Sequence, residues 1–133
     1  MTTLVYGDPH SEWRPLLSAA RGLGRGDSII LVGDCDLDRP LREVLAPVFA
    51  ADIRVLWIQG NHDAGRETWY DNLFGSHPGG CIHTRPVLCD GNLVVGYGGV
   101  FREAVWWPKD DLAEPVHPSP DDFLRRACRK QSM

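Results

Sequence analysis

Three apolar runs, each followed at once by a short polar segment, constrain this chain more than any other feature. The runs cover residues 3–6, 28–32 and 53–58, and they lead into Gly7-Asp8-Pro9-His10, Gly33-Asp34-Cys35-Asp36 and Gly60-Asn61-His62-Asp63. Successive polar segments lie about one strand–helix–strand repeat apart, since Asp8 precedes Asp34 by 26 residues and Asp34 precedes Asn61 by 27. The sequence therefore predicts three parallel strands whose loops share one sheet edge, where open α/β sheets bind ligands.

The residue types in these loops predict what that edge binds. Carboxylates, imidazoles and an amide oxygen would meet there, and such donors suit Mn, Fe or Zn. Taken singly, Asp8, Asp34 and Asn61 could instead be helix caps or turn formers, which is a common use of these residues between a strand and a helix. Three coordinated loops that also carry His10 and His62 favour a metal site.

The three segments, in this order and at this spacing, resemble the first motifs of the calcineurin-like metallophosphoesterase family: Gly-Asp-x-His, Gly-Asp-x-x-Asp and Gly-Asn-His-Asp/Glu. The match spans roughly the first half of the chain. The resemblance implies that Asp8 and His10 hold one divalent ion, that Asp34 bridges two ions and that Asn61 holds the second. It also implies that His62 protonates the leaving oxygen. Two such ions, about 3.5–4 Å apart, can clamp a phosphate and generate a hydroxide nucleophile.

The sequence departs from the family pattern in its second half. The family completes its site with a lone histidine and a later Gly-His-x-His segment, and no such segment occurs here. We interpret His77, His83 and His117 as non-ligands, because no donor cluster surrounds them in the sequence. The expectation is a single, incomplete domain over residues 1–133. It would have a layered α-β-β-α metallophosphoesterase-like fold that lacks the C-terminal part of the second sheet.

Three interpretations of that incompleteness stay open at this point. The sequence could be a truncated gene product, a piece with an artificial boundary, or a half-domain that a second chain completes. Self-association, or association with that second chain, is therefore among the expected partnerships.

The middle motif departs as well. The family often has an acid three residues after the bridging aspartate, where it orients the catalytic histidine. Leu37 occupies that place here, between Asp36 and Asp38. Either neighbour could take the role through a different loop path.

Composition agrees with a globular enzyme and excludes several other classes. The hydrophobic content of 43% and the charged content of 24% fall in the globular range. A net charge of −4 gives no signal for nucleic acid or anionic membrane. No apolar stretch is long enough to span a membrane. Four cysteines without a Cys-x-x-Cys pair or a secretory signal favour reduced thiols and a cytoplasmic location. Cys35 is expected to be a packing residue.

The remaining pattern predicts helices between the strands and a change of architecture after about residue 75. Helices are expected over residues 11–23, from Pro40 through Leu41, Val44, Leu45 and Val48, and over 67–74. Strands are expected over 81–88 and 93–97, around a turn at Asp90-Gly91-Asn92. A bulky aromatic segment at 105–108, a proline-rich loop at 115–120 and a last helix starting at Ser119 complete the pattern.

Two function classes follow from the resemblance. One is a metal-dependent phosphoesterase that hydrolyses a phosphomonoester or phosphodiester. The other is a truncated, weakly active or inactive fragment that keeps a metal or phosphate site and binds a partner chain. A nucleotide-binding α/β domain is disfavoured, because no glycine-rich fingerprint follows the first strand.

Overall fold

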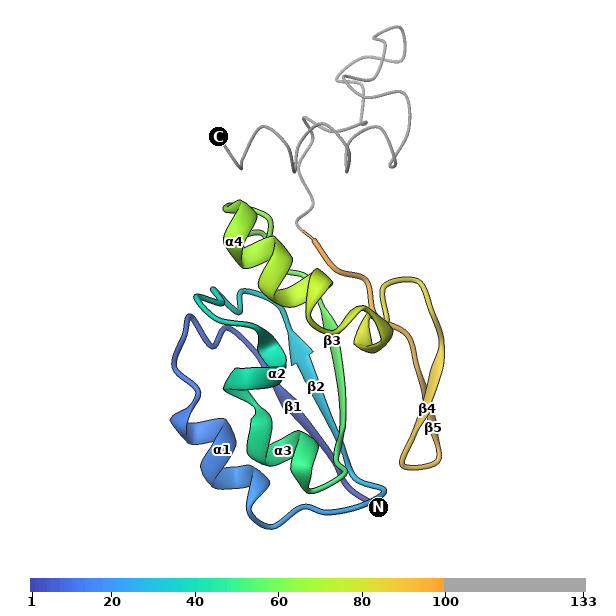
Figure 1. Cartoon of the computed structure of the whole chain (residues 1–133). Coiled ribbons are helices and arrows are strands. Elements are labelled where there is room, and N and C mark those ends of the chain that lie inside the picture. The colour runs from blue at the N-terminus through green and yellow to red at the C-terminus, as the bar shows by residue number, and fades with distance from the viewer. Residues whose placement is uncertain (100–133) are drawn as a thin grey trace, which may run out of the picture.

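The computed structural model describes residues 1–99, which form a parallel sheet with helices on one face and a small hairpin beside it (Figure 1). In chain order the main elements are β1 (Thr3–Tyr6), α1 (Arg14–Ala20), β2 (Ser28–Val32), α2 (Leu41–Val44), α3 (Ala46–Ala50), β3 (Arg54–Ile58), α4 (Glu67–Tyr70), β4 (Val87–Cys89) and β5 (Asn92–Val94). A wide π-type turn, η1 (Asp71–Gly75), continues α4, and a 3₁₀ turn, η2 (Pro78–Gly80), follows it. The predicted aromatic segment, proline-rich loop and last helix lie outside the described residues.

The sheet has the order β1-β2-β3 with all neighbours parallel, as the sequence predicts. Thr3 pairs with Ser28 and Ser28 pairs with Arg54, so the three strands begin in register. Because the strands are also of similar length, they end at the same edge. The loops that follow β1, β2 and β3 are thereby brought side by side.

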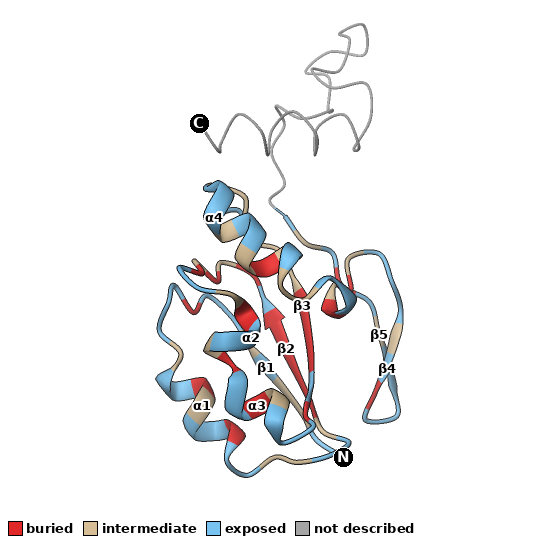
Figure 2. Ribbon diagram, in the orientation of Figure 1, coloured by how far each residue is buried: buried red, intermediate tan, exposed pale blue. Residues whose placement is uncertain are grey.

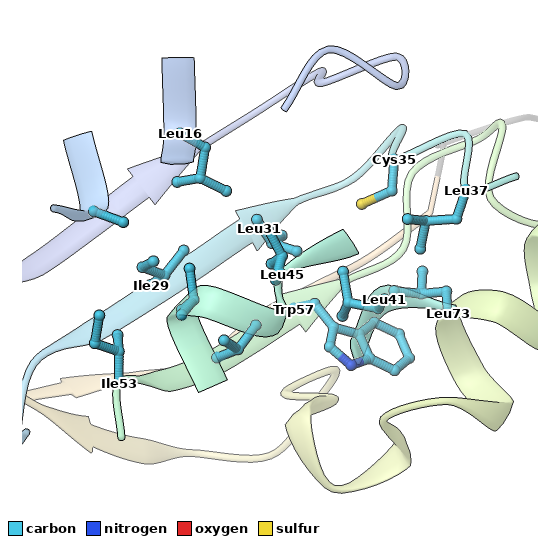
Figure 3. Close-up of a cluster of buried hydrophobic side chains, with 13 residues drawn as sticks. Leu16, Ile29, Leu31, Cys35, Leu37, Leu41, Leu45, Ile53, Trp57 and Leu73 are labelled. Atoms are coloured by element: carbon cyan, nitrogen blue, oxygen red, sulfur yellow. The ribbon is translucent and has the colours of Figure 1, made fainter. Parts of the chain in front are cut away.

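Alternate residues of the strands face two different apolar clusters. Ile29, Leu31 and Trp57 belong to the larger cluster, which the helices α1, α2 and α3 cover (Figures 2 and 3). Ile30 and Leu56 point to the other face and pack with residues of the 82–94 region. Burial on both faces explains why the strands read as continuous apolar runs rather than as alternating patterns.

Two helices differ from their predicted extents for reasons that prolines and loop geometry explain. The first helix begins at Arg14 rather than Ser11, because His10 and Ser11 adopt positive φ angles of 41° and 65°. The predicted helix after Pro40 is split into α2 and α3. Pro47 has no amide hydrogen to continue the helix, and Leu45 between the two pieces has left helical geometry. Leu41, Leu45 and Val48 are nonetheless buried, as the periodicity predicts.

The hairpin confirms the predicted turn, but the predicted strands were too long. Asp90 and Gly91 have φ angles of 48° and 76°, which suit the tight turn between β4 and β5. Before β4, only single bridges pair Cys81 with Trp57 and His83 with Gly96. Pro86, immediately before β4, cannot donate to a strand ladder, so it limits the length of pairing.

Several large apolar side chains stay exposed on the hairpin side. Leu93 and Tyr97 have exposed fractions of 74% and 77%, and Val5 on the second face of the sheet is 59% exposed. The described residues therefore provide one helical layer and one sheet, with partial cover of the second face. Within this range no helix is long and apolar enough to cross a membrane.

Candidate metal centre

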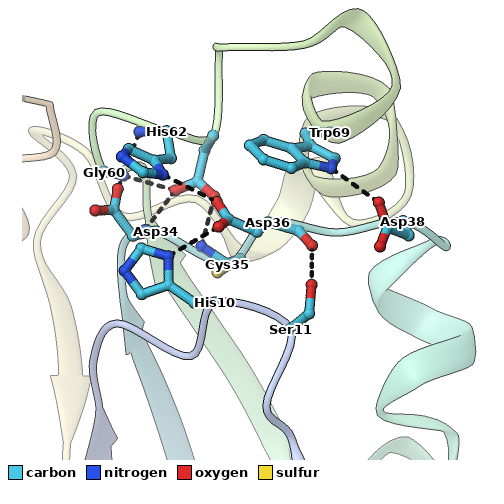
Figure 4. Close-up of polar contacts among 10 residues, drawn as sticks. His10, Ser11, Asp34, Cys35, Asp36, Asp38, Gly60, His62 and Trp69 are labelled. Atoms are coloured by element: carbon cyan, nitrogen blue, oxygen red, sulfur yellow. Dashed lines mark hydrogen bonds and ion pairs between the residues drawn. The ribbon is translucent and has the colours of Figure 1, made fainter.

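The polar segments predicted from the sequence meet at the carboxyl edge of the sheet (Figure 4). Their backbones are unusual: Asp8, Asp34 and Asp36 have φ angles of 48°, 53° and 48°, besides the positive values at His10 and Ser11. Non-glycine residues seldom adopt such angles, and clusters of them are typical of functional sites. His10 N–H donates to Asp34 O at 3.0 Å, which joins the first loop directly to the second.

Two glycines allow the second and third loops to approach each other closely. A Cβ placed on Gly60 would overlap the Asp34 carboxylate, and one placed on Gly33 would lie 2.7 Å from Gly60 Cα. Gly33 also has a φ angle of 88°. Any larger side chain at Gly60 would displace Asp34, so the glycine is required for the position of that carboxylate.

The buried Asp63 carboxylate joins the same two loops through hydrogen bonds. Its side chain is 1% exposed and accepts three backbone N–H groups, from Cys35 at 2.7 Å, Gly60 at 2.7 Å and Asp34 at 2.9 Å. Burial raises the pKa of the Asp63 carboxyl above its ordinary value, and the three amide donors oppose that rise. No role was predicted for Asp63 from the sequence, where its place after Asn61-His62 is the available signal.

The convergence produces two groups of potential ligands that share His10. In one group, donor atoms of Asp8, His10 and Asp34 all lie within 4.8 Å of one another. In the other, donor atoms of His10, Asp36 and His62 satisfy the same limit. Three of the four predicted metal ligands are therefore brought together, and the predicted acid His62 lies beside them.

Asn61, the fourth predicted ligand, lies on the third loop between Gly60 and His62 and is exposed. Its backbone position is at the same edge, but its role as a ligand stays a prediction. The backbone N–H of the next residue, His62, donates to Asp34 Oδ1 at 3.0 Å, which orients the carboxylate predicted to bridge two ions.

Asp36 is the carboxylate that contacts both histidines. Its Oδ2 lies 2.8 Å from His10 Nδ1, and its Oδ1 lies 3.5 Å from His62 Nδ1. The hydrogen bond to Asp36 raises the pKa of His10 above its usual range, and the Asp34 and Asp8 charges add to the effect. With Nδ1 donating to Asp36, the Nε2 lone pair of His10 is free for a metal ion, the common arrangement of a carboxylate behind a histidine ligand.

The two neighbours of Asp36 have other tasks. Leu37, at the place where the family often has an acid, is 1% exposed and belongs to the core. Asp38 is exposed and accepts a hydrogen bond from Trp69 Nε1 at 3.1 Å. Of the two candidates that the sequence left open for orienting His62, Asp36 is the one in contact with it.

The other described histidines and Cys35 have partners unrelated to a metal. His77 Nε2 bonds Val55 O at 3.0 Å, and His83 Nδ1 accepts Gly98 N–H at 3.0 Å. Cys35 is fully buried in the core, and burial raises the pKa of its thiol far above its ordinary value. The burial of Cys35 agrees with the packing role predicted for it. The prediction that His77 and His83 are not ligands stays a prediction, and His117 lies outside the described residues.

The residues present fit a divalent cation on three grounds. Carboxylates and imidazoles are donors that Mn, Fe and Zn accept. Asp8, Asp34 and Asp36 have no ion pair with an arginine among residues 1–99, so the negative charge at this edge is not balanced there by cationic side chains other than the histidines. Asp36 Oδ1 is also buried and accepts no hydrogen bond within residues 1–99; His62 Nδ1, 3.5 Å away, offsets part of the resulting cost in free energy, and a cation bound beside this oxygen would offset more.

Comparisons with known proteins agree with this chemistry. A family model described as calcineurin-like phosphoesterase matches residues 1–131. An uncharacterized protein of Haemophilus influenzae (strain ATCC 51907 / DSM 11121 / KW20 / Rd) is 28% identical over 120 residues, which cover 86% of this chain and 50% of that protein. The chain thus spans about half the length of this relative. No solved structure matches.

Proposed function

Because the chain belongs to the calcineurin-like phosphoesterase family, we propose that it is a metal-dependent phosphoesterase acting on a phosphomonoester or phosphodiester. The observation that carries the proposal is the meeting of Asp8, His10 and Asp34 donor atoms within 4.8 Å at the carboxyl edge of the sheet. Divalent ions held there would polarise the phosphoryl oxygens and supply a nucleophile from water at neutral pH.

The proposed ligands are Asp8 and His10 for one ion, Asp34 for two ions and Asn61 for the second. Metal ligands must be fixed in orientation, and one backbone contact and one side-chain contact do this here. The His62 N–H bond fixes Asp34, and the His10–Asp36 bond fixes the imidazole with Nε2 available. A second ion bound mainly by Asp34 and Asn61 would have few protein ligands, so we propose that it binds more weakly than the first.

His62 is the proposed general acid. Its Nδ1 faces Asp36 Oδ1 at 3.5 Å, and its ring meets that of His10 edge-on with centroids 5.2 Å apart. The Asp36 carboxylate behind the ring orients the imidazole, and an imidazole in this position can act as a proton donor to a leaving oxygen. The half-exposed His62 side chain, at 47%, is open to a substrate.

A second candidate function is an inactive or weakly active domain that binds metal or a partner chain. Two observations favour it: no Gly-His-x-His segment occurs in the sequence, and apolar side chains such as Leu93 are exposed on the hairpin. An exposed apolar surface of this kind is typical of a site where another polypeptide segment packs. Both candidates use the same metal residues, so they differ in turnover rather than in binding.

Turnover with two phosphodiesters whose leaving groups differ in basicity tests the assignment of His62. One is bis(4-nitrophenyl) phosphate, whose 4-nitrophenolate leaving group needs no proton. The other is dimethyl phosphate, whose methoxide leaving group must be protonated as it departs. With Mn²⁺ present, His62→Ala should lower hydrolysis of the alkyl diester by about 10²–10⁴-fold and that of the aryl diester much less.

Asp38→Asn is the matched control, because Asp38 lies two residues from Asp36 and contacts Trp69 instead of a histidine. It should leave both rates unchanged. Equal losses for both substrates in His62→Ala would contradict the acid role. Mn²⁺ binding without any turnover in the unaltered chain would support the second candidate.

A further inference from the structure

A hollow of about 290 Å³ lies on the outer edge of β3, at the end of the strand away from the metal centre. Its floor comes from the first half of β3, including Ile53 and Val55, and its walls come from α2, α3 and the segment before β4. The volume is at the lower end for small-ligand sites, which run from about 300 Å³ upward.

Arg42, Arg54 and Arg85 line this hollow, and two of them donate hydrogen bonds to uncharged groups. Arg54 donates from Nε and Nη2 to Ser28 Oγ at 3.1 and 3.0 Å, and from Nη2 to Leu88 O at 2.6 Å. Arg85 donates from Nη2 to Gly79 O at 2.8 Å and to Cys81 O at 2.7 Å. These bonds fix both guanidinium groups without neutralising their charges.

The third arginine is held by an aromatic ring and an uncharged histidine. Arg42 lies over the ring of Phe49, 4.7 Å from its centroid, and Nη2 lies 3.2 Å from His77 Nδ1. His77 Nε2 donates to Val55 O, which leaves Nδ1 as an acceptor for Arg42. Burial, together with the Arg42 charge, lowers the pKa of His77 and so keeps this ring neutral.

Within the described part of the chain, the positive charge of the hollow is not balanced. Among residues 1–99, no aspartate or glutamate lines the hollow, and none of these three arginines forms an ion pair. Each guanidinium also has an Nη1 group with no hydrogen-bond partner in that part of the chain. Guanidinium groups with free donors are the side chains best suited to a tetrahedral oxyanion.

We propose that this hollow is an anion site for a phosphate group, separate from the metal centre. The three positive charges of these guanidinium groups more than offset the two negative charges of a phosphate dianion, and hydrogen bonds to ionised groups are stronger than those between neutral groups. Phe49, Ile53 and Val87 give the hollow an apolar part as well. A small apolar group attached to the phosphate would pack there, so a phosphate ester or phosphonate is the preferred ligand class.

The test is an NMR titration of the metal-free chain. Binding is monitored through the chemical shifts of the arginine Nε–H groups and of the β3 backbone amides. Chelation of metal beforehand removes phosphate binding at the metal centre. Inorganic phosphate is one probe and phenylphosphonate, which cannot be hydrolysed as an ester, is the other. Sodium chloride at equal ionic strength reports on screening alone. Tighter binding of phenylphosphonate assigns the hollow to a phosphate with an apolar group, whereas equal binding assigns it to the free anion; both support an anion site.

Arg42→Gln removes one charge from the hollow, and Arg25→Gln is the matched control. Arg25 is exposed, pairs with Asp52 at 2.7 Å and does not line the hollow. Loss of one charge-assisted contact should weaken binding at least about tenfold in Arg42→Gln, with no change in Arg25→Gln. Arg42→Lys, which keeps the charge, should lose less, and it serves if the glutamine variant fails to fold. No saturable shift at β3, or equal affinities in the unaltered chain and both Arg42 variants, would overturn the proposal.

Discussion

Replacement of Asp63 should unfold the second and third loops of the metal centre and cost much of the stability of the domain. Oδ2 accepts the Asp34 and Gly60 amides, and Oδ1 accepts the Cys35 amide. Asp63→Ala removes all three bonds, and each buried donor left without an acceptor costs about 1–3 kcal/mol. Burial raises the pKa of Asp63, which means that the buried carboxylate charge itself costs free energy. Alanine removes that cost, so it offsets part of the loss. We expect a net loss of about 2–4 kcal/mol for Asp63→Ala.

Asp63→Asn refines the expectation. Its oxygen can keep the two bonds at the Oδ2 position, while its amide group would face the Cys35 N–H. The loss should therefore be smaller, about 1–3 kcal/mol. Urea unfolding followed by circular dichroism at pH 7.5 gives both values, with Asp38→Asn as an exposed control. A loss below about 1 kcal/mol for Asp63→Ala would refute the reasoning, because the amides would then have other acceptors.

Two further predictions concern the same edge. Gly60→Ala should abolish Mn²⁺ binding, because the added Cβ would overlap the Asp34 carboxylate. Gly75→Ala is the control and should bind Mn²⁺ normally, since a Cβ there meets nothing within 4 Å. Calorimetric titration compares the two variants. The His10–Asp36 hydrogen bond raises the pKa of His10 in the folded state above 6.5. In the metal-free chain, the contribution of this bond to folding stability is therefore complete below pH 6.5 and is lost as pH rises through the folded-state pKa. The urea midpoint of the unaltered chain should exceed that of Asp36→Asn at low pH, and a gap that widens with rising pH would count against this assignment.

The sequence predicted the sheet because its signal is local and repeated. Apolar runs that are buried on both faces and punctuated by Gly-Asp or Gly-Asn locate β1, β2 and β3 almost to the residue. The helices were less predictable in extent. Ser11 looks like a helix start in sequence, but the loop that orients His10 holds it at positive φ. Pro47 marks the break between α2 and α3, yet the apolar periodicity of Leu41, Leu45 and Val48 runs through that break.

In the candidate site, the sequence identified the donors but not the contacts among them. Residues from three loops could be expected at one edge because parallel strands place them there. Spacing could not show whether Asp36 or Asp38 contacts His62, because that depends on the direction in which the loop turns. In the structure Asp36 has a φ angle of 48° and Leu37 is buried, and with this loop path Asp36 faces His62. The place of Asp63 after Asn61-His62 is a sequence signal for a role at this edge, but its three backbone-amide partners could not be predicted, because no sequence pattern displays them.

Calorimetric titration of Mn²⁺ into the unaltered chain, Asp34→Asn and Asp38→Asn is the most direct test of the proposed metal centre. Asp34 lies in the ligand group with Asp8 and His10, whereas Asp38 carries the same charge four residues further along and contacts Trp69. We expect one tightly bound ion and a second, weaker one in the unaltered chain, the same in Asp38→Asn, and loss of both in Asp34→Asn. No Mn²⁺ binding in the unaltered chain, or equal binding in Asp34→Asn, would contradict it.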